Sequence, residues 1–255
     1  MSRGRLQNRA AIITGGARGI GKAVAFKMVK EGASVMLLDL LSDELAQVTD
    51  ELKALGGNAY SVICDVSDRG GVADAVSLTL EKLGTVDILV NNAGVSLVDS
   101  LEEIKEADWD RLVRINLKGS FFCSQSVMPI MKENEYGKII NISSRASLGK
   151  LSRIVYGTTK AGLIGMTRNM ALELAKYGVN VNCVAPGPIA TELFNSVNPE
   201  DSEKTKAIID AIPLKRMGRP EDVANLVAFL ASDEASFMTG QTLFICGGLT
   251  VGMAH

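Results

Sequence analysis

Tyr156 and Lys160 lie four residues apart and are the pair in this sequence best suited to chemistry. Their spacing places both side chains on one face of a helix, one turn apart. A phenol ordinarily loses its proton near pH ~10, and a neighbouring cation favours the phenolate. The pair therefore predicts a group that gives or takes a proton near neutral pH.

A glycine-rich run, Thr14–Gly21, follows the first apolar segment of the chain. Glycines at 15, 19 and 21 permit a tight turn and let backbone N–H groups approach a pyrophosphate at a helix N-terminus. Their spacing differs from the common GxGxxG fingerprint. Asp39 ends the second apolar run, where a carboxylate binds ribose hydroxyls and repels a 2′-phosphate. Together these features predict a bound dinucleotide, NAD in preference to NADP.

Arg18 is the one residue of this run that favours NADP, because an arginine in the glycine loop could hold the 2′-phosphate. Asp39 would lie directly in the way, so we expect its repulsion to dominate. Arg18 would then contact the adenine ribose or the surface of the protein. NADP stays as the less favoured cofactor.

Short apolar runs alternate with helical patterns along the whole chain, which predicts a doubly wound α/β fold with a mostly parallel sheet of seven strands. No linker or internal repeat divides the chain, so one domain, 1–255, is expected. The expected strands are Ala10–Thr14, Ser34–Leu38, Ala59–Cys64, Ile88–Asn91, Lys138–Ile142, Asn180–Val184 and Leu243–Cys246. The expected helices are Lys22–Lys30, Asp43–Leu55, Val72–Leu83, Trp109–Met131, Gly157–Tyr177 and Pro220–Ala231.

The segment Pro186–Pro220 is the least regular and holds five of the chain's 6 prolines. It predicts a lid over the site, with a plain surface excursion as the alternative.

Bulk composition excludes several classes of function. A net charge of −2 gives no reason to expect nucleic acid or an anionic membrane as partner. The 4 cysteines are widely spaced in apolar runs, as for buried thiols in a reducing cytoplasm. The single histidine is residue 255, which argues against histidine-based hydrolases and metal sites. No apolar run at the N-terminus is long enough for a signal or a membrane segment.

In combination the motifs resemble the short-chain dehydrogenase/reductase superfamily over nearly the full length. The motifs that carry the resemblance are Thr14–Gly21, Asp65, Asn91–Gly94, Asn116, Ser143–Ser144, Tyr156–Lys160, Pro186–Gly187 and Thr191. The resemblance implies a Rossmann-type fold, reversible hydride transfer between a carbonyl or alcohol and NAD(P), and a homotetramer. It implies that residues 1–150 mainly bind the dinucleotide, with 144–156 and 186–220 as substrate loop and lid.

The resemblance also implies roles for individual residues. Asn116, Ser144, Tyr156 and Lys160 would be catalytic, with Lys160 also on the nicotinamide ribose and Asn116 anchoring a water. The register of the strand favours Ser144, whereas the 13-residue spacing to the tyrosine favours Ser143, which stays the alternative. The cofactor would be bound by Tyr156, Lys160 and by Gly15, Arg18, Gly19, Ile20, Gly21, Asp39, Asp65, Val66, Asn92, Ala93, Gly94, Pro186, Gly187, Ile189 and Thr191.

Three basic residues without an intervening acid, Arg145, Lys150 and Arg153, precede the tyrosine. They suggest an anionic substrate, although a solvent-facing or subunit-contact role is the simpler interpretation. Ser143, Arg145, Arg153 and Phe194 are the candidate substrate residues. The leading functional prediction is an NAD-dependent dehydrogenase of a small alcohol, hydroxy acid or sugar. An NADPH-dependent 3-oxoacyl-carrier-protein reductase and a non-catalytic NAD-binding protein are the alternatives.

Overall fold

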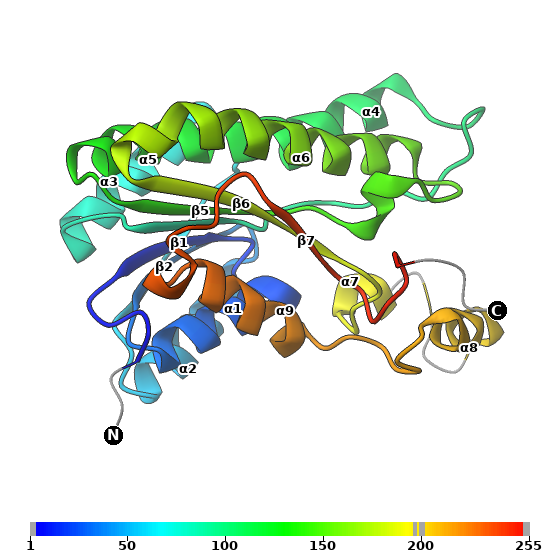
Figure 1. The fold of residues 1–255 in the computed structure, drawn as a ribbon, viewed down its shortest axis with the longest axis horizontal. Helices are drawn as coiled ribbons and strands as arrows, with labels where there is room; N and C mark the ends of the chain where they lie inside the picture. The colour runs from blue at the N-terminus through cyan, green and yellow to red at the C-terminus, as the bar shows by residue number, and fades with distance from the viewer. Residues whose placement is uncertain (1–3, 196–197, 199–201, 252–255) are drawn as a thin grey trace.

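A seven-stranded sheet, parallel throughout, forms the centre of the protein in a computed structural model that describes residues 4–195, 198 and 202–251 (Figure 1). The strand order is β3-β2-β1-β4-β5-β6-β7, which confirms the predicted doubly wound sheet. The strands are β1 Ala10–Thr14, β2 Ser34–Asp39, β3 Ala59–Ile63, β4 Ile88–Asn91, β5 Gly137–Ile142, β6 Val179–Pro186 and β7 Thr242–Ile245.

Helices cover both faces of this sheet (Figure 1). Helices α1, α2 and α9 lie on one face, and α3, α5 and α6 lie on the other. The bounds are α1 Gly19–Lys30, α2 Ser42–Ala54, α3 Arg69–Leu83, α4 Glu106–Leu112, α5 Ser120–Glu133, α6 Ile154–Leu174, α7 Glu192–Asn195, α8 Glu203–Ala211 and α9 Pro220–Leu230. No helix in the described part of the chain is long and apolar enough to cross a membrane.

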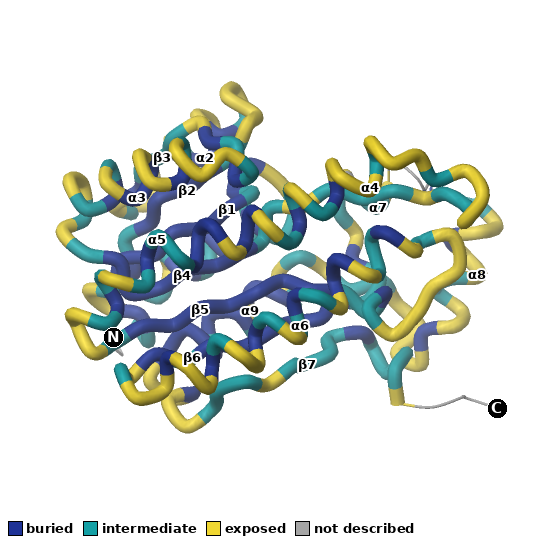
Figure 2. Tube along the Cα trace, turned by 90° about the horizontal axis from the view of Figure 1, so that it is seen from above, coloured by how far each residue is buried: buried dark blue, intermediate teal, exposed yellow. Residues whose placement is uncertain are grey.

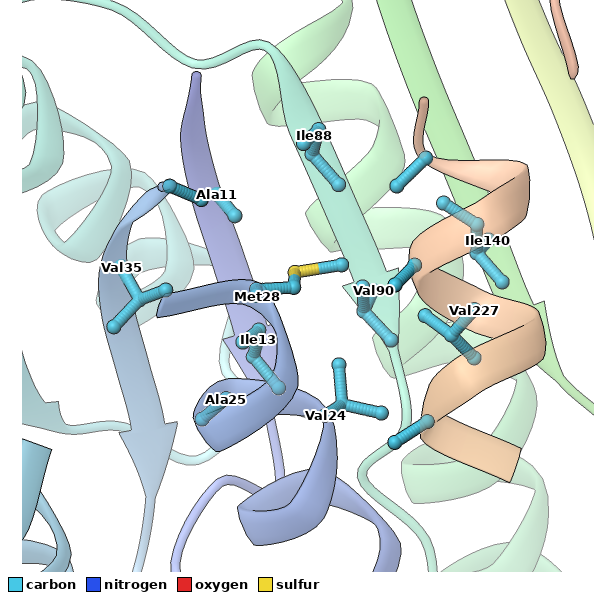
Figure 3. Close-up of a cluster of buried hydrophobic side chains, with 14 of the residues drawn as sticks. Ala11, Ile13, Val24, Ala25, Met28, Val35, Ile88, Val90, Ile140 and Val227 are labelled. Atoms are coloured by element: carbon cyan, nitrogen blue, oxygen red, sulfur yellow. The ribbon is translucent and has the colours of Figure 1, made fainter. Parts of the chain in front are cut away.

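Burial on both faces explains the continuous apolar runs of the central strands. Every residue of β1, β4 and β5 is buried, whereas the edge strands β3 and β7 are largely half-buried (Figure 2). On one face, Val24 and Met28 of α1 pack near Ile13, Val90 and Val227 (Figure 3). A second cluster on the other face joins the sheet to α3, α5 and α6. The two cores fix the helices to the sheet and hold the strand ends in place.

One predicted helix is interrupted. The segment expected as a single helix over Trp109–Met131 consists of α4, a π-helical stretch Val113–Gly119 and α5. Single-turn π segments inside helices concentrate at functional sites, and this one contains the predicted catalytic residue Asn116. The apolar pattern gave no sign of the change in hydrogen bonding.

The proline-rich segment is more regular than predicted. It contains α7 and the nine-residue helix α8, because no proline falls within α8: Pro213 follows its end and Pro220 begins α9. Ser202 caps α8 by accepting a hydrogen bond of 3.2 Å from the Thr205 N–H. Part of the predicted lid, at 196–197 and 199–201, lies outside the described residues.

Strands β1 and β4 are neighbours although β2 and β3 separate them in sequence, so the chain reverses its direction of winding between them. Because all strands are parallel, their carboxyl ends meet at one edge of the sheet. Ligands of open α/β sheets bind at that edge, beside such a reversal.

Candidate active site

The glycine loop joins the end of β1 to the start of α1. Gly15 and Gly19 have φ values of +66° and +51°, which side-chain-bearing residues rarely adopt. A Cβ atom at Gly21 would lie 1.9 Å from the Gly15 carbonyl oxygen, so only glycine lets α1 begin this close to the loop.

The first turn of α1 fits the pyrophosphate of a dinucleotide. Its N-cap residue, Arg18, makes no side-chain capping bond, and no acidic residue lies in the first turn. The N–H groups of a helix N-terminus attract anions, and those of Gly19 and Ile20 have no intrahelical acceptor.

Thr14 and Asn92 brace this loop against the end of β4. The Asn92 side-chain amide donates hydrogen bonds of 3.0 Å to the carbonyls of Thr14 and Gly15. The Thr14 hydroxyl accepts bonds of 3.0 Å from the N–H groups of Asn92 and Ala93. Asn92 and Ala93 thus position the glycine loop by hydrogen bonds to Thr14 and Gly15.

Asp39 lies at the end of β2, beside the loop. One carboxylate oxygen accepts a hydrogen bond of 3.0 Å from the Ala17 N–H, and the other accepts bonds from Leu40 and Leu41 of 2.7 and 3.2 Å. These bonds fix the negative charge at the carboxyl end of β2, next to the glycine loop. Arg18 forms an exposed ion pair with Glu44 of α2, so its guanidinium is directed to the protein's own surface.

Asp65 and Val66 follow β3. The Asp65 carboxylate accepts bonds of 2.8 and 2.7 Å from the Ser67 N–H and hydroxyl, and these bonds hold its pKa below the usual range. Val66 packs against Gly119, where an added Cβ would lie 2.7 Å from a Val66 methyl. The pair forms a rigid corner next to the π-helical stretch.

Tyr156 lies in the first turn of α6, and the Ser144 side chain lies near enough to its hydroxyl to affect its pKa. Burial raises the Tyr156 pKa, whereas the Ser144 side chain and the charge of Arg153 lower it. The four-residue spacing predicted that Lys160 would cause this lowering. In the structure the nearby groups that favour the phenolate are Ser144 and Arg153.

Lys160 is buried one turn further along α6. Its ammonium lies 5.8 Å from the centre of the Tyr156 ring and donates a bond of 2.7 Å to the Ile142 carbonyl. Burial lowers its pKa to about 8. Its backbone carbonyl accepts a bond of 2.7 Å from the Ser143 hydroxyl, which is therefore directed at the Lys160 backbone and not at the Tyr156 hydroxyl.

Asn116 lies in the middle of the π-helical stretch and is fully buried. Its side chain accepts a bond of 2.8 Å from the Val95 N–H and donates bonds of 2.9 Å to the Val95 carbonyl and 3.2 Å to the Thr159 hydroxyl. A Cβ at Gly94 would lie 3.1 Å from the Asn116 side-chain oxygen and 3.5 Å from the Lys160 ammonium. Asn116 thus connects the loop after β4 to the helix that carries Tyr156 and Lys160.

The segment after β6 closes the other side of the site. Gly187 lies so close to β7 that an added Cβ would be 2.7 Å from the Cα of Cys246. Ile189 is buried, and the Thr191 side chain would lie 3.3 Å from a Cβ placed on Gly19. This contact brings the segment from Pro186 to Thr191 against the glycine loop.

The structure thus brings the predicted cofactor and catalytic residues to one edge of the sheet. The sequence indicated no role for Thr159, did not show that Thr14 braces the loop, and did not connect Arg153 with Tyr156. The three-residue spacing of Arg153 and Tyr156 at a helix start was the available signal. No group of metal-ligating side chains occurs within the described ranges.

This site and fold define a nicotinamide-dependent oxidoreductase, and comparison with known proteins gives its family. Residues 15–250 match a family described as enoyl-(acyl carrier protein) reductase. The chain belongs to the short-chain dehydrogenase/reductase family, as its sequence predicted. It is an oxidoreductase that acts on CH–OH groups with NAD or NADP.

Three similar proteins illustrate the range of substrates within this family. One is the (2S)-[(R)-hydroxy(phenyl)methyl]succinyl-CoA dehydrogenase subunit BbsD of Thauera aromatica, 41% identical over 95% of this chain and 97% of the relative. Another is the 3-oxoacyl-[acyl-carrier-protein] reductase FabG of Thermotoga maritima, 40% identical over 97% of this chain and 100% of the relative. The crystal structure of levodione reductase superposes with a TM-score of 0.93 at 33% identity, covering 97% of this chain and 100% of that one.

Proposed function

We propose that the protein is an NAD-dependent dehydrogenase that interconverts a secondary alcohol and a ketone. The observation that carries this proposal is the proximity of Ser144, Tyr156 and a buried Lys160, whose ammonium lies 5.8 Å from the centre of the Tyr156 ring, at the edge of the sheet where the glycine loop and Asp39 lie.

Tyr156 is the proposed acid and base. In oxidation its phenolate takes the proton of the substrate hydroxyl, and in reduction its phenol returns a proton to the carbonyl oxygen. Bound nicotinamide supplies the hydride acceptor or donor. Ser144 donates a hydrogen bond to the substrate oxygen and stabilises the negative charge that develops there.

Lys160 and Asn116 support this proton transfer. The Lys160 ammonium is the candidate partner of the nicotinamide ribose hydroxyls. The candidate proton exit runs past the Asn116 backbone, where a water would link Lys160 to solvent. Ile189 and Thr191 are the candidate partners of the carboxamide, and Phe194 is the candidate apolar wall of the substrate pocket.

Asp39 supports NAD over NADP. Its carboxylate is fixed by three backbone N–H groups, and a 2′-phosphate would meet this charge at close range. Arg18 is engaged by Glu44 and would have to leave that ion pair to bind a phosphate.

A 3-oxoacyl-[acyl-carrier-protein] reductase that uses NADPH is the second candidate. The identity to FabG of Thermotoga maritima favours it. Asp39 and the net charge of −2 weigh against it. A non-catalytic NAD-binding role is the least supported, because Asn116, Tyr156 and Lys160 are all in place. We further propose that the protein is a homotetramer in the cytoplasm. Light scattering on the purified protein tests the tetramer.

Calorimetric titration of NADH and NADPH against the native protein tests the proposed cofactor. We expect tight NADH binding and weak NADPH binding. Asp39→Asn removes the charge with little change of shape. We expect it to reduce the preference for NADH over NADPH by about tenfold or more, the effect of one close charge. Asp50→Asn, an exposed acid on α2, is the matched control and should change nothing. Tight NADPH binding by the native protein would favour the carrier-protein reductase over the NAD-dependent dehydrogenase.

A further inference from the structure

Arg153 lies between the proposed catalytic tyrosine and the loop that follows β4. It is the N-cap residue of α6, three positions before Tyr156, and its guanidinium carbon is 5.9 Å from the centre of the Tyr156 ring. One guanidinium nitrogen, Nη1, donates to the Ser96 hydroxyl and, over 3.2 Å, to the Leu97 carbonyl. These bonds aim the side chain at the site from the start of the helix.

The Arg153 charge has no carboxylate partner within the described ranges, where no acid lies within 4.0 Å of it. Asp99 pairs with Arg153 through the backbone, yet its carboxylate makes no ion pair with the guanidinium. Among the described residues, the Nε and Nη2 atoms of Arg153 have no hydrogen-bond acceptor. Arg153 is half-buried, and desolvation lowers its pKa. A partly desolvated cation without a counter-charge is costly, and an anion that binds there offsets that cost.

Three further cations surround the same place. Desolvation lowers the pKa of Lys150, and the charges of Arg153, Arg145 and Lys204 are near enough to lower it further. Lys204 comes from α8 and the others from the segment before α6, so two distant parts of the sequence supply the cluster. None of the four cations forms an ion pair with a described acid. Like charges gathered without acids create a positive potential that attracts an anionic ligand.

We propose that Arg153 and Lys150, with Arg145 and Lys204 beside them, form a subsite for a carboxylate of the substrate. The proposal rests on the proposed oxidoreductase function and narrows its substrate to hydroxy acids and the corresponding keto acids. The planar guanidinium of Arg153 binds a carboxylate through its free Nε and Nη2 groups. A carboxylate held there is a few carbon atoms from an oxygen that contacts Ser144 and Tyr156.

The position of Arg153 favours a small carboxylate over an acidic protein surface. Arg153 is half-buried and adjacent to Tyr156, whereas Lys150 and Lys204 are exposed. Because Arg153 is half-buried, a small group reaches it more easily than a flat protein surface, which would meet the two lysines first.

A matched pair of ligands that differ only in charge tests this subsite. The probes are 4-oxopentanoate and its methyl ester, with 5-oxohexanoate and its methyl ester as a longer pair. Binding of each is measured by calorimetry on the protein saturated with NADH or NAD, and turnover is measured separately by NADH absorbance. The variants are Arg153→Gln, Lys150→Gln and the charge-conserving Arg153→Lys. Arg168→Gln is the control, since Arg168 is an exposed arginine about 22 Å further along the same helix.

We expect the native protein to bind the acids at least tenfold more tightly than their esters. Arg153→Gln should remove most of this preference, Lys150→Gln part of it, and Arg168→Gln none, with ester binding unchanged throughout. Arg153→Lys should retain part of it, which separates loss of charge from local misfolding. Equal binding of acid and ester by the native protein, or an equal loss of both in Arg153→Gln, would overturn the subsite.

Binding and turnover separate the two proposals. Preferential acid binding without reduction of any probe would support the subsite and count against the proposed reaction. Reduction of esters and acids with equal efficiency would support the reaction and overturn the subsite. If Lys150→Gln weakens binding of an acidic carrier protein but no variant changes binding of the small acids, the cluster is a docking surface and the carboxylate proposal is wrong.

Discussion

The Ser143 hydroxyl donates a hydrogen bond of 2.7 Å to the backbone carbonyl of Lys160. A second bond runs the opposite way, from the Lys160 ammonium to the Ile142 carbonyl over 2.7 Å. Together they fasten the end of β5 to α6. Ser143 is therefore occupied in holding the helix, while the next residue, Ser144, contacts the Tyr156 hydroxyl. This geometry favours Ser144 as the serine that binds the substrate oxygen.

Substitution of the two serines should therefore have opposite signatures. Ser144→Ala removes the bond to the reacting oxygen, so we expect kcat to fall by about 10²- to 10³-fold with NADH binding retained. Ser143→Ala removes a buried hydrogen bond, so we expect the free energy of unfolding to fall by about 1–3 kcal/mol with a smaller loss of kcat. Steady-state kinetics and urea unfolding of both variants provide the measurement. The reverse pattern would assign the catalytic role to Ser143.

Removal of the Arg153 charge should shift the pH profile of oxidation. That charge lowers the Tyr156 pKa, so Arg153→Gln is expected to raise it. Oxidation needs the phenolate, and its acidic limb in a plot of kcat/KM should move to higher pH. A neutral alcohol as substrate keeps the proposed carboxylate subsite out of the measurement. An unmoved limb in Arg153→Gln would show that the guanidinium does not act on Tyr156.

Lys160 should make the stability of the protein depend on pH above neutrality. Its pKa is lowered from 10.5 to about 8 in the folded state. Between these values the unfolded chain binds a proton that the folded protein does not bind, so the free energy of unfolding rises with pH. The free-energy cost of burying the charged Lys160 ammonium is fully present below pH 8 and disappears toward pH 10.5.

Lys160→Met lacks this proton, and the comparison isolates its effect. From pH 8 to 9.5 the native protein should gain about 1.5 kcal/mol relative to the variant, somewhat less than about 1.4 kcal/mol per pH unit, because the folded protein still binds about half a proton at pH 8. Urea unfolding across this range measures the gain. The Ile142 carbonyl left unpaired in the variant shifts its stability by a constant that does not change with pH. Parallel pH dependences of the two proteins would contradict the prediction.

Two glycines in helices should respond in opposite ways to alanine. A Cβ at Gly21 would lie 1.9 Å from the Gly15 carbonyl oxygen, whereas a Cβ at Gly165 in α6 meets nothing within 4 Å. Gly21→Ala should displace the glycine loop, weaken NADH binding by about tenfold or more and lower Tm. Gly165→Ala should stabilise the protein by about 0.5–1 kcal/mol and leave NADH binding unchanged. Calorimetry and thermal unfolding measure both, and NADH binding by Gly21→Ala at native affinity would be inconsistent with the close approach.

The central strands were predictable because they are buried on both faces. Ala10–Thr14 and Ile88–Asn91 were predicted with the bounds that the structure shows. Such strands appear as continuous apolar runs, and no competing pattern disturbs them. The predicted bounds of β2, β3, β5 and β7 are wrong by one residue at one or both ends, and β6 extends one residue before and two residues after its predicted bounds, so the existence of a strand was predicted better than its ends.

Helix α8 and the π-helical stretch were not predictable in the same way. The five prolines of 186–220 suggested irregular chain, although Ser202 before an exposed, polar helix was a capping signal. The π-helical stretch depends on backbone hydrogen bonding around Asn116, which leaves the apolar pattern unchanged.

The residues of the candidate site were predictable as a set, because the glycine loop, Asp39 and the Tyr156–Lys160 pair each follow a strand or begin a helix. The contacts among them were not. The choice between Ser143 and Ser144 depends on where two hydroxyls point, and the effect of Arg153 on Tyr156 depends on side-chain packing. Neither can be read from spacing along the chain.

The order of strands also bears on how the chain folds as it is synthesised. The Ala10 N–H binds the Asp87 carboxylate across 77 residues, where β1 meets β4 at the centre of the sheet. A chain emerging from the ribosome therefore has β1 paired with β2 only, and one side of its central strand stays open until β4 is made. Contacts between residues this distant form slowly, so the nascent N-terminal half exposes an unpaired apolar edge for several seconds at about 5–20 residues per second. During that interval the unpaired edge of β1 is open to pairing with other chains.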